Sequence, residues 1–180
     1  MTDGTSGVLA FWREAGAERW YTRDANFDAT VRERFFDLWQ EAAAGRLSSW
    51  ETSDEGALAL VIVLDQFPRN MFRGLAEAFS SDALALEVAS RALARGVDAR
   101  TGPPLLQFLY LPFMHSEGLA DQVRCVALFR GGDDPENLRY AEEHADIIRR
   151  FGRFPHRNRA LGRTTTPEEQ AFLDAGGFSG

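Results

Sequence analysis

Eight apolar residues in succession, from Ala57 to Leu64, constrain the fold of this chain more than any other feature. An amphipathic surface helix needs a polar face, and a run of this length leaves none. The run is preceded by Thr52 and, three residues later, by Glu55, which is the pattern of a capping box. We therefore expect a central, enclosed helix, which Pro68 helps to end.

Apolar residues recur with a helical period along the rest of the chain, without the alternation that is typical of strands. Cap and turn residues set the expected boundaries. Helices are expected at about residues 8–15, 27–44, 52–67, 82–95, 103–112, 117–129, 134–150 and 166–175. Seven or eight helices joined by mostly short loops predict an all-α protein. We expect a single domain over residues 1–180, with frayed ends at 1–7 and 175–180.

The composition excludes several classes of partner. A formal net charge of −7 argues against nucleic acid or an anionic membrane surface as a partner. No apolar run approaches the roughly 20 residues of a membrane span, and residues 1–7 lack the pattern of a signal peptide. Cys125 is the only cysteine, so an intrachain disulfide is excluded. We expect a cytoplasmic protein, and the sequence leaves its cofactors and its oligomeric state unknown.

Two short motifs nearly repeat each other, each at the end of an expected helix. They are Gln66-Phe67-Pro68-Arg69-Asn70 and Arg153-Phe154-Pro155-His156-Arg157-Asn158. Their flanking helices share little, so the two motifs form only a weak repeat. Helix ends seldom need so many polar groups merely to turn the chain. The two motifs are therefore the best site candidates in the sequence.

Asp65 directly follows the apolar run, and a buried carboxylate is unfavourable unless it is paired. Arg69 can pair with it if the helix persists past Phe67, and Arg73 or the arginines of residues 149–163 are other candidates. One interpretation is a buried ion pair that ties the end of the central helix to a neighbour, and the other is a ligand site. Structural ion pairs of this kind are common, which favours the first interpretation.

A second candidate is the segment of residues 108–117, where His115 ends an aromatic helix. The helix dipole favours a cationic His at this position, and Glu117 would raise its pKa and help it to carry protons. Capping of the two helix ends is the alternative. It is the simpler explanation for Ser116, and for His115 both interpretations stay open.

The third candidate is the segment of residues 149–163, which holds six Arg residues and no Asp or Glu. His156 lies within it, and the helical spacing places His144 on the inner face of the preceding helix. A lone inward His is usually a core residue, but all three His of the chain fall near these polar motifs. Arg and His that converge on a loop are suited to phosphate or carboxylate. A solvated basic loop that offsets part of the net charge explains the pattern equally well.

No metal site is predicted, because the His and acidic residues show none of the spacings typical of helical metal ligands. The sequence also lacks the glycine-rich dinucleotide motif, the phosphate-loop lysine motif and the serine-hydrolase elbow. No catalytic signature therefore assigns an activity, and the sequence leaves open whether the protein is an enzyme.

Three strings of the sequence resemble the domain-of-unknown-function 924 family of bacterial proteins. They are residues 64–70 with 72–74, residues 108–117 and residues 149–158, and they occur in the family's order along essentially the whole chain. The resemblance implies an all-helical fold of antiparallel helix pairs, related to tetratricopeptide-like repeats. It implies no activity, cofactor or catalytic residue.

Two functions fit these observations. In the first, the ends of three helices converge on one pocket for an anionic small molecule, with acid–base chemistry of a hydrolytic kind. We expect catalytic roles there for His115, Glu117 and His144, and ligand binding by Asp65, Arg69, Arg73, Arg153, His156, Arg157 and Asn158. In the second, the protein is a tetratricopeptide-like module that binds a peptide or protein along a groove, and the polar motifs only lock helix ends. The clustering of the unusual residues in three short strings favours the first, which predicts that Arg69 and the three His share one cavity.

Overall fold

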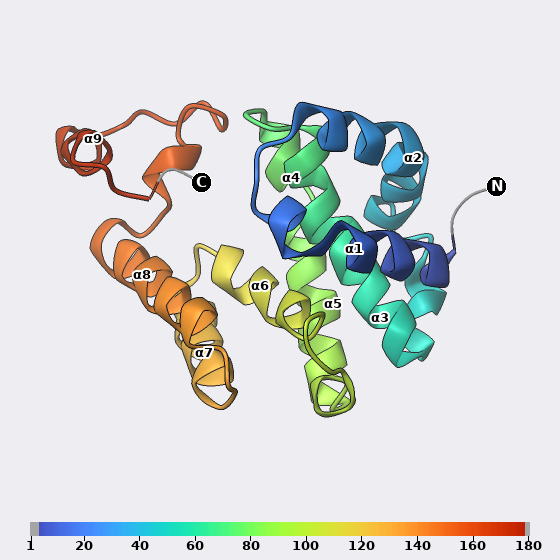
Figure 1. Ribbon diagram of the computed structural model, residues 1–180. Coiled ribbons are helices and arrows are strands. Elements are labelled where there is room, and N and C mark those ends of the chain that lie inside the picture. The colour runs from blue at the N-terminus through green and yellow to red at the C-terminus, as the bar shows by residue number, and fades with distance from the viewer. Residues whose placement is uncertain (1–3, 179–180) are drawn as a thin grey trace. The chain divides into compact units, whose positions relative to one another are not determined.

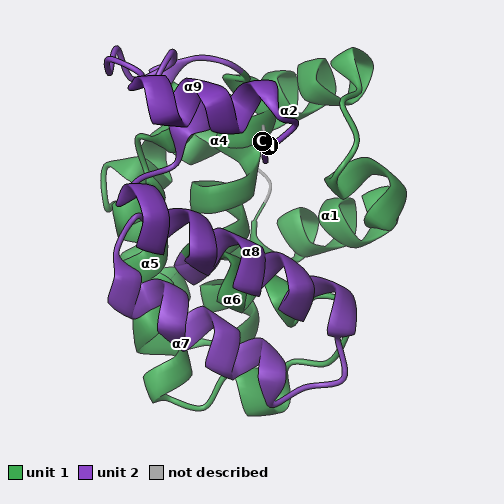
Figure 2. Ribbon diagram, turned by 90° about the vertical axis from the view of Figure 1, so that its left-hand side faces the viewer, with its two compact units in different colours: residues 1–73, 77–112 green, residues 74–76, 113–180 purple. Residues whose placement is uncertain are grey.

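The computed structural model describes residues 4–178, and all regular secondary structure within them is helical. The predicted all-α fold is confirmed. The chain forms two compact units, residues 1–73 with 77–112 and residues 74–76 with 113–180 (Figure 2). The single domain over the whole chain stays a prediction. None of the described helices combines the length and the hydrophobicity of a membrane span.

The first unit is built around packed aromatic rings. Its helices are α1 (Thr5–Trp20), α2 (Ala25–Ala43), α3 (Asp54–Val61), α4 (Phe67–Met71), α5 (Asp82–Ala94) and most of α6 (Gln107–His115) (Figure 1). α3 packs against α1 and α5, and α2 packs against α4. The ring centroids of Phe35 and Phe67 lie 4.5 Å apart, and the ring centroid of Trp12 lies 5.6 Å from those of Phe67 and Phe108. All four rings are fully buried, so the aromatic-rich chain places much of its Phe and Trp in this core.

The central helix is enclosed, as predicted, since the residues from Ala57 to Leu64 are at most 4% exposed. It does not end at Pro68. A π-helical turn, Ile62–Gln66, joins α3 to α4, and the helix continues to Met71. When this continuous rod is counted once, the described residues form eight α-helices, which agrees with the predicted number.

Ser81, at the N-cap position of α5, explains why the central helix tolerates Pro68. Pro68 has no backbone N–H, so the carbonyl of Leu64 lacks the donor four residues on. Ser81 Oγ donates to this carbonyl at 2.6 Å, and the indole N–H of Trp39 donates to Ser81 Oγ at 3.1 Å. Trp39, which the helical pattern places in the core, is only half-buried. The hydrogen bond from Ser81 thus satisfies the Leu64 carbonyl, which Pro68 leaves without a backbone donor.

Helices α3 and α6 begin later than predicted. Ser53, not Thr52, caps α3, because Ser53 Oγ accepts the N–H of Gly56 at 3.0 Å. α6 begins at Gln107, four residues later than expected, and Pro112 lies inside the helix. Neighbouring Ser and Thr residues offer equivalent hydroxyls, so the sequence pattern places a cap only to within a residue.

The second unit contains the end of α6, α7 (Leu119–Arg130), α8 (Pro135–Phe151) and α9 (Pro167–Asp174). α7 and α8 lie side by side as a helical hairpin (Figure 1). Asp134 caps α8 by accepting the N–H of Asn137 at 3.0 Å, and Gly152 ends it with a left-handed φ of +68°. Both signals were expected from the sequence. The chain also forms 3-10 turns at Ser48–Thr52, Ala76–Phe79, Asp98–Arg100 and Pro155–Arg157.

Ordered structure extends further toward both ends than the expected fraying at 1–7 and 175–180. α1 already begins at Thr5, whereas a start near Val8 was expected. At the other end, Phe178 packs against His144 with ring centroids 4.4 Å apart. Residues 1–3 and 179–180 lie outside the described residues.

Replacement of Ser81 by Ala should lower the free energy of unfolding by about 1–3 kcal/mol, because a buried carbonyl and an indole N–H would lose their partner. Chemical denaturation measures the change. Ser80 is exposed and donates only to the nearby carbonyl of Glu77, so Ser80→Ala is the control and should change stability by less than about 0.5 kcal/mol. Equal losses in the two variants would contradict this account of Pro68.

Candidate functional site

Arg69 of the first motif forms ion pairs with two acidic residues of its own unit. Its guanidinium lies 3.3 Å from the Asp65 carboxylate and forms a fork with Asp82 at 2.9 and 3.0 Å. Asp65 is buried and also accepts a hydrogen bond from Gln66 Nε2 at 2.6 Å. Burial by itself lowers the pKa of Arg69, but the charges of Asp65 and Asp82 outweigh burial and raise it. The expected Asp65–Arg69 ion pair is present, and it ties the central helix to α5.

Asn70 and Arg73 share one carboxylate, that of Asp28 in the first turn of α2. Asn70 Nδ2 donates to it at 2.8 Å, and Arg73 donates through Nε and Nη2 at 2.7 Å each. Burial raises the pKa of Asp28, but these bonds and the charge of Arg73 lower it below its ordinary value. The helix dipole also favours an anion at this position. The polar side chains of the first motif are thus bonded within the first unit.

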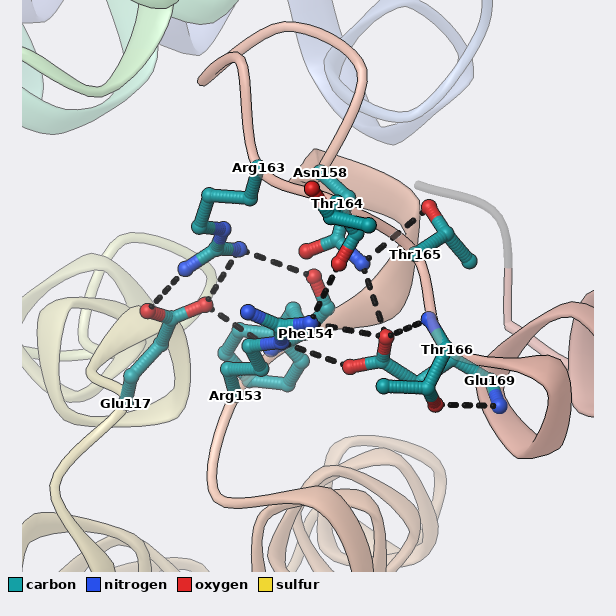
Figure 3. Close-up of polar contacts among 9 residues, drawn as sticks. All are labelled: Glu117, Arg153, Phe154, Asn158, Arg163, Thr164, Thr165, Thr166 and Glu169. Atoms are coloured by element: carbon teal, nitrogen blue, oxygen red, sulfur yellow. Dashed lines mark hydrogen bonds and ion pairs between the residues drawn. The ribbon is translucent and has the colours of Figure 1, made fainter.

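Arg153 and Asn158 of the second motif share Glu169, in the first turn of α9 (Figure 3). Arg153 donates to it through Nε and Nη2 at 2.6 and 2.8 Å, and Asn158 Nδ2 donates at 3.1 Å. Glu169 also accepts the backbone N–H of Thr166, which completes the capping box of α9. The bonds from Arg153 are the largest cause that lowers the pKa of Glu169 to about 2. It is therefore a carboxylate at neutral pH.

Glu117 and Arg163 hold the peptide groups of Phe154 from two sides (Figure 3). Glu117 Oε1 accepts the N–H of Phe154 at 2.8 Å, and Arg163 Nη2 donates to its carbonyl oxygen at 3.1 Å. The two side chains are joined to each other at 2.8 and 3.0 Å. Burial raises the pKa of Glu117, but Arg163 and the Phe154 N–H lower it below its ordinary value. Glu117 is thus held as a charged carboxylate, which is a poor proton donor at neutral pH.

Two of the three His of the chain, His144 and His156, pack against the ring of Phe154. The ring centroids of His144 and His156 lie 5.4 and 5.6 Å from that of Phe154, and Cζ of Arg157 lies 4.6 Å from it. His115 is close enough for its charge to act on His144. We call His115, His144, Phe154, His156 and Arg157 the histidine cluster. All of it belongs to the second unit.

His144 is buried and neutral at physiological pH. Its burial is the largest cause, followed by the charge of His115, and together with Arg157 they lower its pKa to about 4. His144 Nδ1 lies 2.8 Å from the carbonyl oxygen of Tyr140. Because a carbonyl only accepts, Nδ1 carries the proton of the neutral ring and Nε2 keeps its lone pair. His144 is therefore a weak base in a region of positive potential.

The predicted site residues are divided between the two units. Asp65, Arg69 and Arg73 belong to the first unit, and the other candidates, from residue 115 onward, belong to the second. A cavity shared by Arg69 and the three His stays a prediction. A groove of about 180 Å³ in the first unit, at Arg13 and Pro104, is lined by none of the predicted site residues.

The arginine-rich segment is largely neutralised by acids from outside it. Within the described residues, four of its six arginines form ion pairs, Arg149 with Asp146, Arg150 with Glu168, Arg153 with Glu169 and Arg163 with Glu117. Arg157 is buried against the Phe154 ring, and Arg159 is exposed. The arginines are thus concentrated in the sequence, but acidic residues from other segments neutralise most of their charge in the folded chain.

Metal and thiol chemistry find no support among the described residues. No group of three or more His, Cys, Asp or Glu in residues 4–178 is arranged to hold a metal ion. Cys125 is buried, and burial raises the pKa of its thiol to about 12, so it is a core residue and not a nucleophile.

Four residues that shape these contacts were missed from the sequence: Asp28, Arg163, Glu169 and Phe178. Glu169 was recognised only as a capping residue, and Arg163 only as one charge of the basic segment. Phe178 was assigned to the frayed end. Asp28 lies 45 residues from Arg73, and the sequence carries no local signal for a pair so far apart.

Sequence comparison matches residues 8–177 to the family described as bacterial protein of unknown function, DUF924. The chain belongs to the DUF924 family. It is similar to a protein of unknown function from Agrobacterium tumefaciens whose structure is solved. The two are 44% identical, and the match covers 95% of this chain and 97% of that one with a TM-score of 0.91. A search of curated proteins finds no match. The resemblance drawn from three strings of sequence is therefore confirmed.

In this DUF924 protein, Glu169→Gln should lower the free energy of unfolding by about 2–3 kcal/mol, because Arg153 and Asn158 would lose a largely buried carboxylate. Urea denaturation measures the loss. The adjacent Glu168 is exposed and pairs with Arg150 at the surface, so Glu168→Gln is the matched control and should cost less than about 0.5 kcal/mol. If the two variants were equally stable, the shared carboxylate would not be the lock that we describe.

Stability should fall as the pH falls below about 6.5. The unfolded His144 titrates near its ordinary value, whereas burial lowers its pKa in the native state to about 4. The unfolded state therefore binds the extra proton between these values, which lowers the free energy of unfolding by about 1 kcal/mol from pH 6.5 to 5.5. His144→Phe keeps a ring there and should remove this part of the pH dependence. Denaturation curves at the two pH values test it, and identical slopes in both proteins would contradict it.

Proposed function

We propose that the histidine cluster binds an anionic small molecule. The observation that carries the proposal is the convergence of two imidazoles, His144 and His156, and one guanidinium, Arg157, on the Phe154 ring of the second unit. Cationic N–H groups of these two kinds form strong hydrogen bonds to phosphate and carboxylate. Burial is the largest cause of the low pKa of His144, and the charges of His115 and Arg157 lower it further, which is consistent with the proposal.

Binding is better supported than catalysis. An acid–base reaction needs a group that gives and takes a proton near neutral pH. Glu117 is held as a carboxylate by Arg163 and by the Phe154 N–H, and His144 stays neutral. Asp65, Arg69 and Arg73 act in the proposal as structural ion pairs of the first unit, and not as ligand contacts.

The alternative is a helical module that binds a peptide or protein without catalysis. One observation favours it, namely that the arginines of both motifs form ion pairs within the chain. Arg69, Arg73 and Arg153 each bind carboxylates of their own unit. In this alternative the polar motifs only lock helix ends, and a groove of a tetratricopeptide-like array would bind the partner.

A thermal-shift screen with inorganic phosphate, phosphorylated metabolites and carboxylic acids distinguishes the two functions. A bound anion at ten times its Kd should add about 1.4 kcal/mol of stability, which raises Tm by roughly 3–6 °C for a chain of this size. His156→Gln should abolish the shift.

Arg159→Gln is the control for this screen, because it removes a positive charge from the same segment at an exposed position. Its thermal shift should equal that of the native chain. A shift that survives in His156→Gln would place the anion elsewhere. If no anion stabilises the native protein, the partner-binding alternative replaces the proposal.

A further inference from the structure

Phe178 fills the space beside the histidine cluster with a side chain from the end of the described chain. Its ring centroid lies 4.4 Å from that of His144 and 5.1 Å from that of His156, with interplanar angles of 59° and 79°. The ring also packs against the small apolar core of Ile147, Ile148 and Phe154. Tilted and edge-to-face contacts of this kind are the favoured geometries of aromatic pairs. The two imidazoles thus form the walls of a slot that suits a planar ring.

The tether of Phe178 is suited to a ring that can leave the slot. Phe178 follows Gly176 and Gly177, and Gly176 has a left-handed φ of +80°. The N–H of Gly177 donates to the carbonyl of Phe172 at 3.0 Å, which fixes the chain just before the ring. Among the described residues, the ring contacts then hold Phe178 itself. Both glycines are held by backbone hydrogen bonds, so the ring can leave the slot only by rotation beyond Gly177.

We propose that Phe178 occupies the slot of a planar ring, and that the ligand class of the cluster is an anion that carries an aromatic ring, such as an aryl phosphate or an aryl carboxylate. The inference rests on the proposed anion binding. Phe178 supplies the ring contacts of such a ligand but no negative charge. A ligand with both groups reproduces the contacts of Phe178 and adds hydrogen bonds to the cationic groups.

Competition with Phe178 has a measurable consequence. While the ring of Phe178 is in the slot, an aryl ligand cannot use it, so its apparent Kd is the intrinsic Kd divided by the fraction of open slot. Inorganic phosphate has no ring and does not compete for the slot. Removal of the Phe178 ring should therefore strengthen binding of phenyl phosphate selectively.

Titration of the full chain with phenyl phosphate and with inorganic phosphate tests this inference, with the imidazole C–H resonances as the readout. The chain contains three His, all of them in the cluster, so every imidazole resonance reports on it. Phe178→Ala should lower the Kd of phenyl phosphate by about tenfold, which corresponds to a slot that is open one tenth of the time. The Kd of inorganic phosphate should stay within about twofold. Phe178→Trp retains a ring and should bind phenyl phosphate no more tightly than the native chain.

The outcomes separate this inference from the proposed function. If both anions shift the resonances but Phe178→Ala does not change the ratio of their Kd values, anion binding stands and the aromatic slot is wrong. An equal gain in Phe178→Ala and Phe178→Trp would also overturn the slot, since the gain would not come from removal of the ring. If neither anion shifts any resonance in the native chain or in Phe178→Ala, the proposed function fails, and the slot with it.

Discussion

Each of the two Phe-Pro motifs is held by a carboxylate of its own, which binds an asparagine amide and an arginine guanidinium at the same time. Asp28 binds Asn70 and Arg73 in the first unit. Glu169 binds Asn158 and Arg153 in the second. Both acids lie in the first turn of a helix, where the dipole favours negative charge. The motifs therefore share a physical solution, a helix end bonded to the start of another helix, even though their flanking sequences differ.

The candidate site depends on a second constraint, the hold on the peptide groups of Phe154. Glu117 and Arg163 bind its N–H and its carbonyl, so the backbone on both sides of the ring is fixed. His144, His156 and Arg157 then pack around that ring. Glu117 thus acts on the cluster through the position of Phe154. These contacts support a structural role for Glu117, whereas its place beside His115 predicts a catalytic one.

Local signals in the sequence predict the helices well and the contacts between them poorly. The cap of α8 by Asp134 and the capping box at Thr166 follow from residues within one turn, and so does the Asp65–Arg69 pair. The continuation through Pro68 depends on Ser81, a residue of another helix. The Glu117–Arg163 pair joins residues 46 positions apart. Such pairs are set by tertiary packing, so a local pattern cannot predict them. For the same reason, the sequence alone overstates the positive charge of the arginine-rich segment.

The balance of charge at the cluster explains which ligands it can favour. Neighbouring acids neutralise most arginines of residues 149–163, while Arg157 lies buried against the Phe154 ring and His115 adds to the positive potential. His144 is neutral, so it adds an aromatic wall without further charge. Under the proposed function, an uncharged ring would gain only the contacts that Phe178 already makes. An anion without a ring would not replace the contacts that Phe178 makes with the imidazole rings. Only a ligand with both properties gains from the potential and from the walls together.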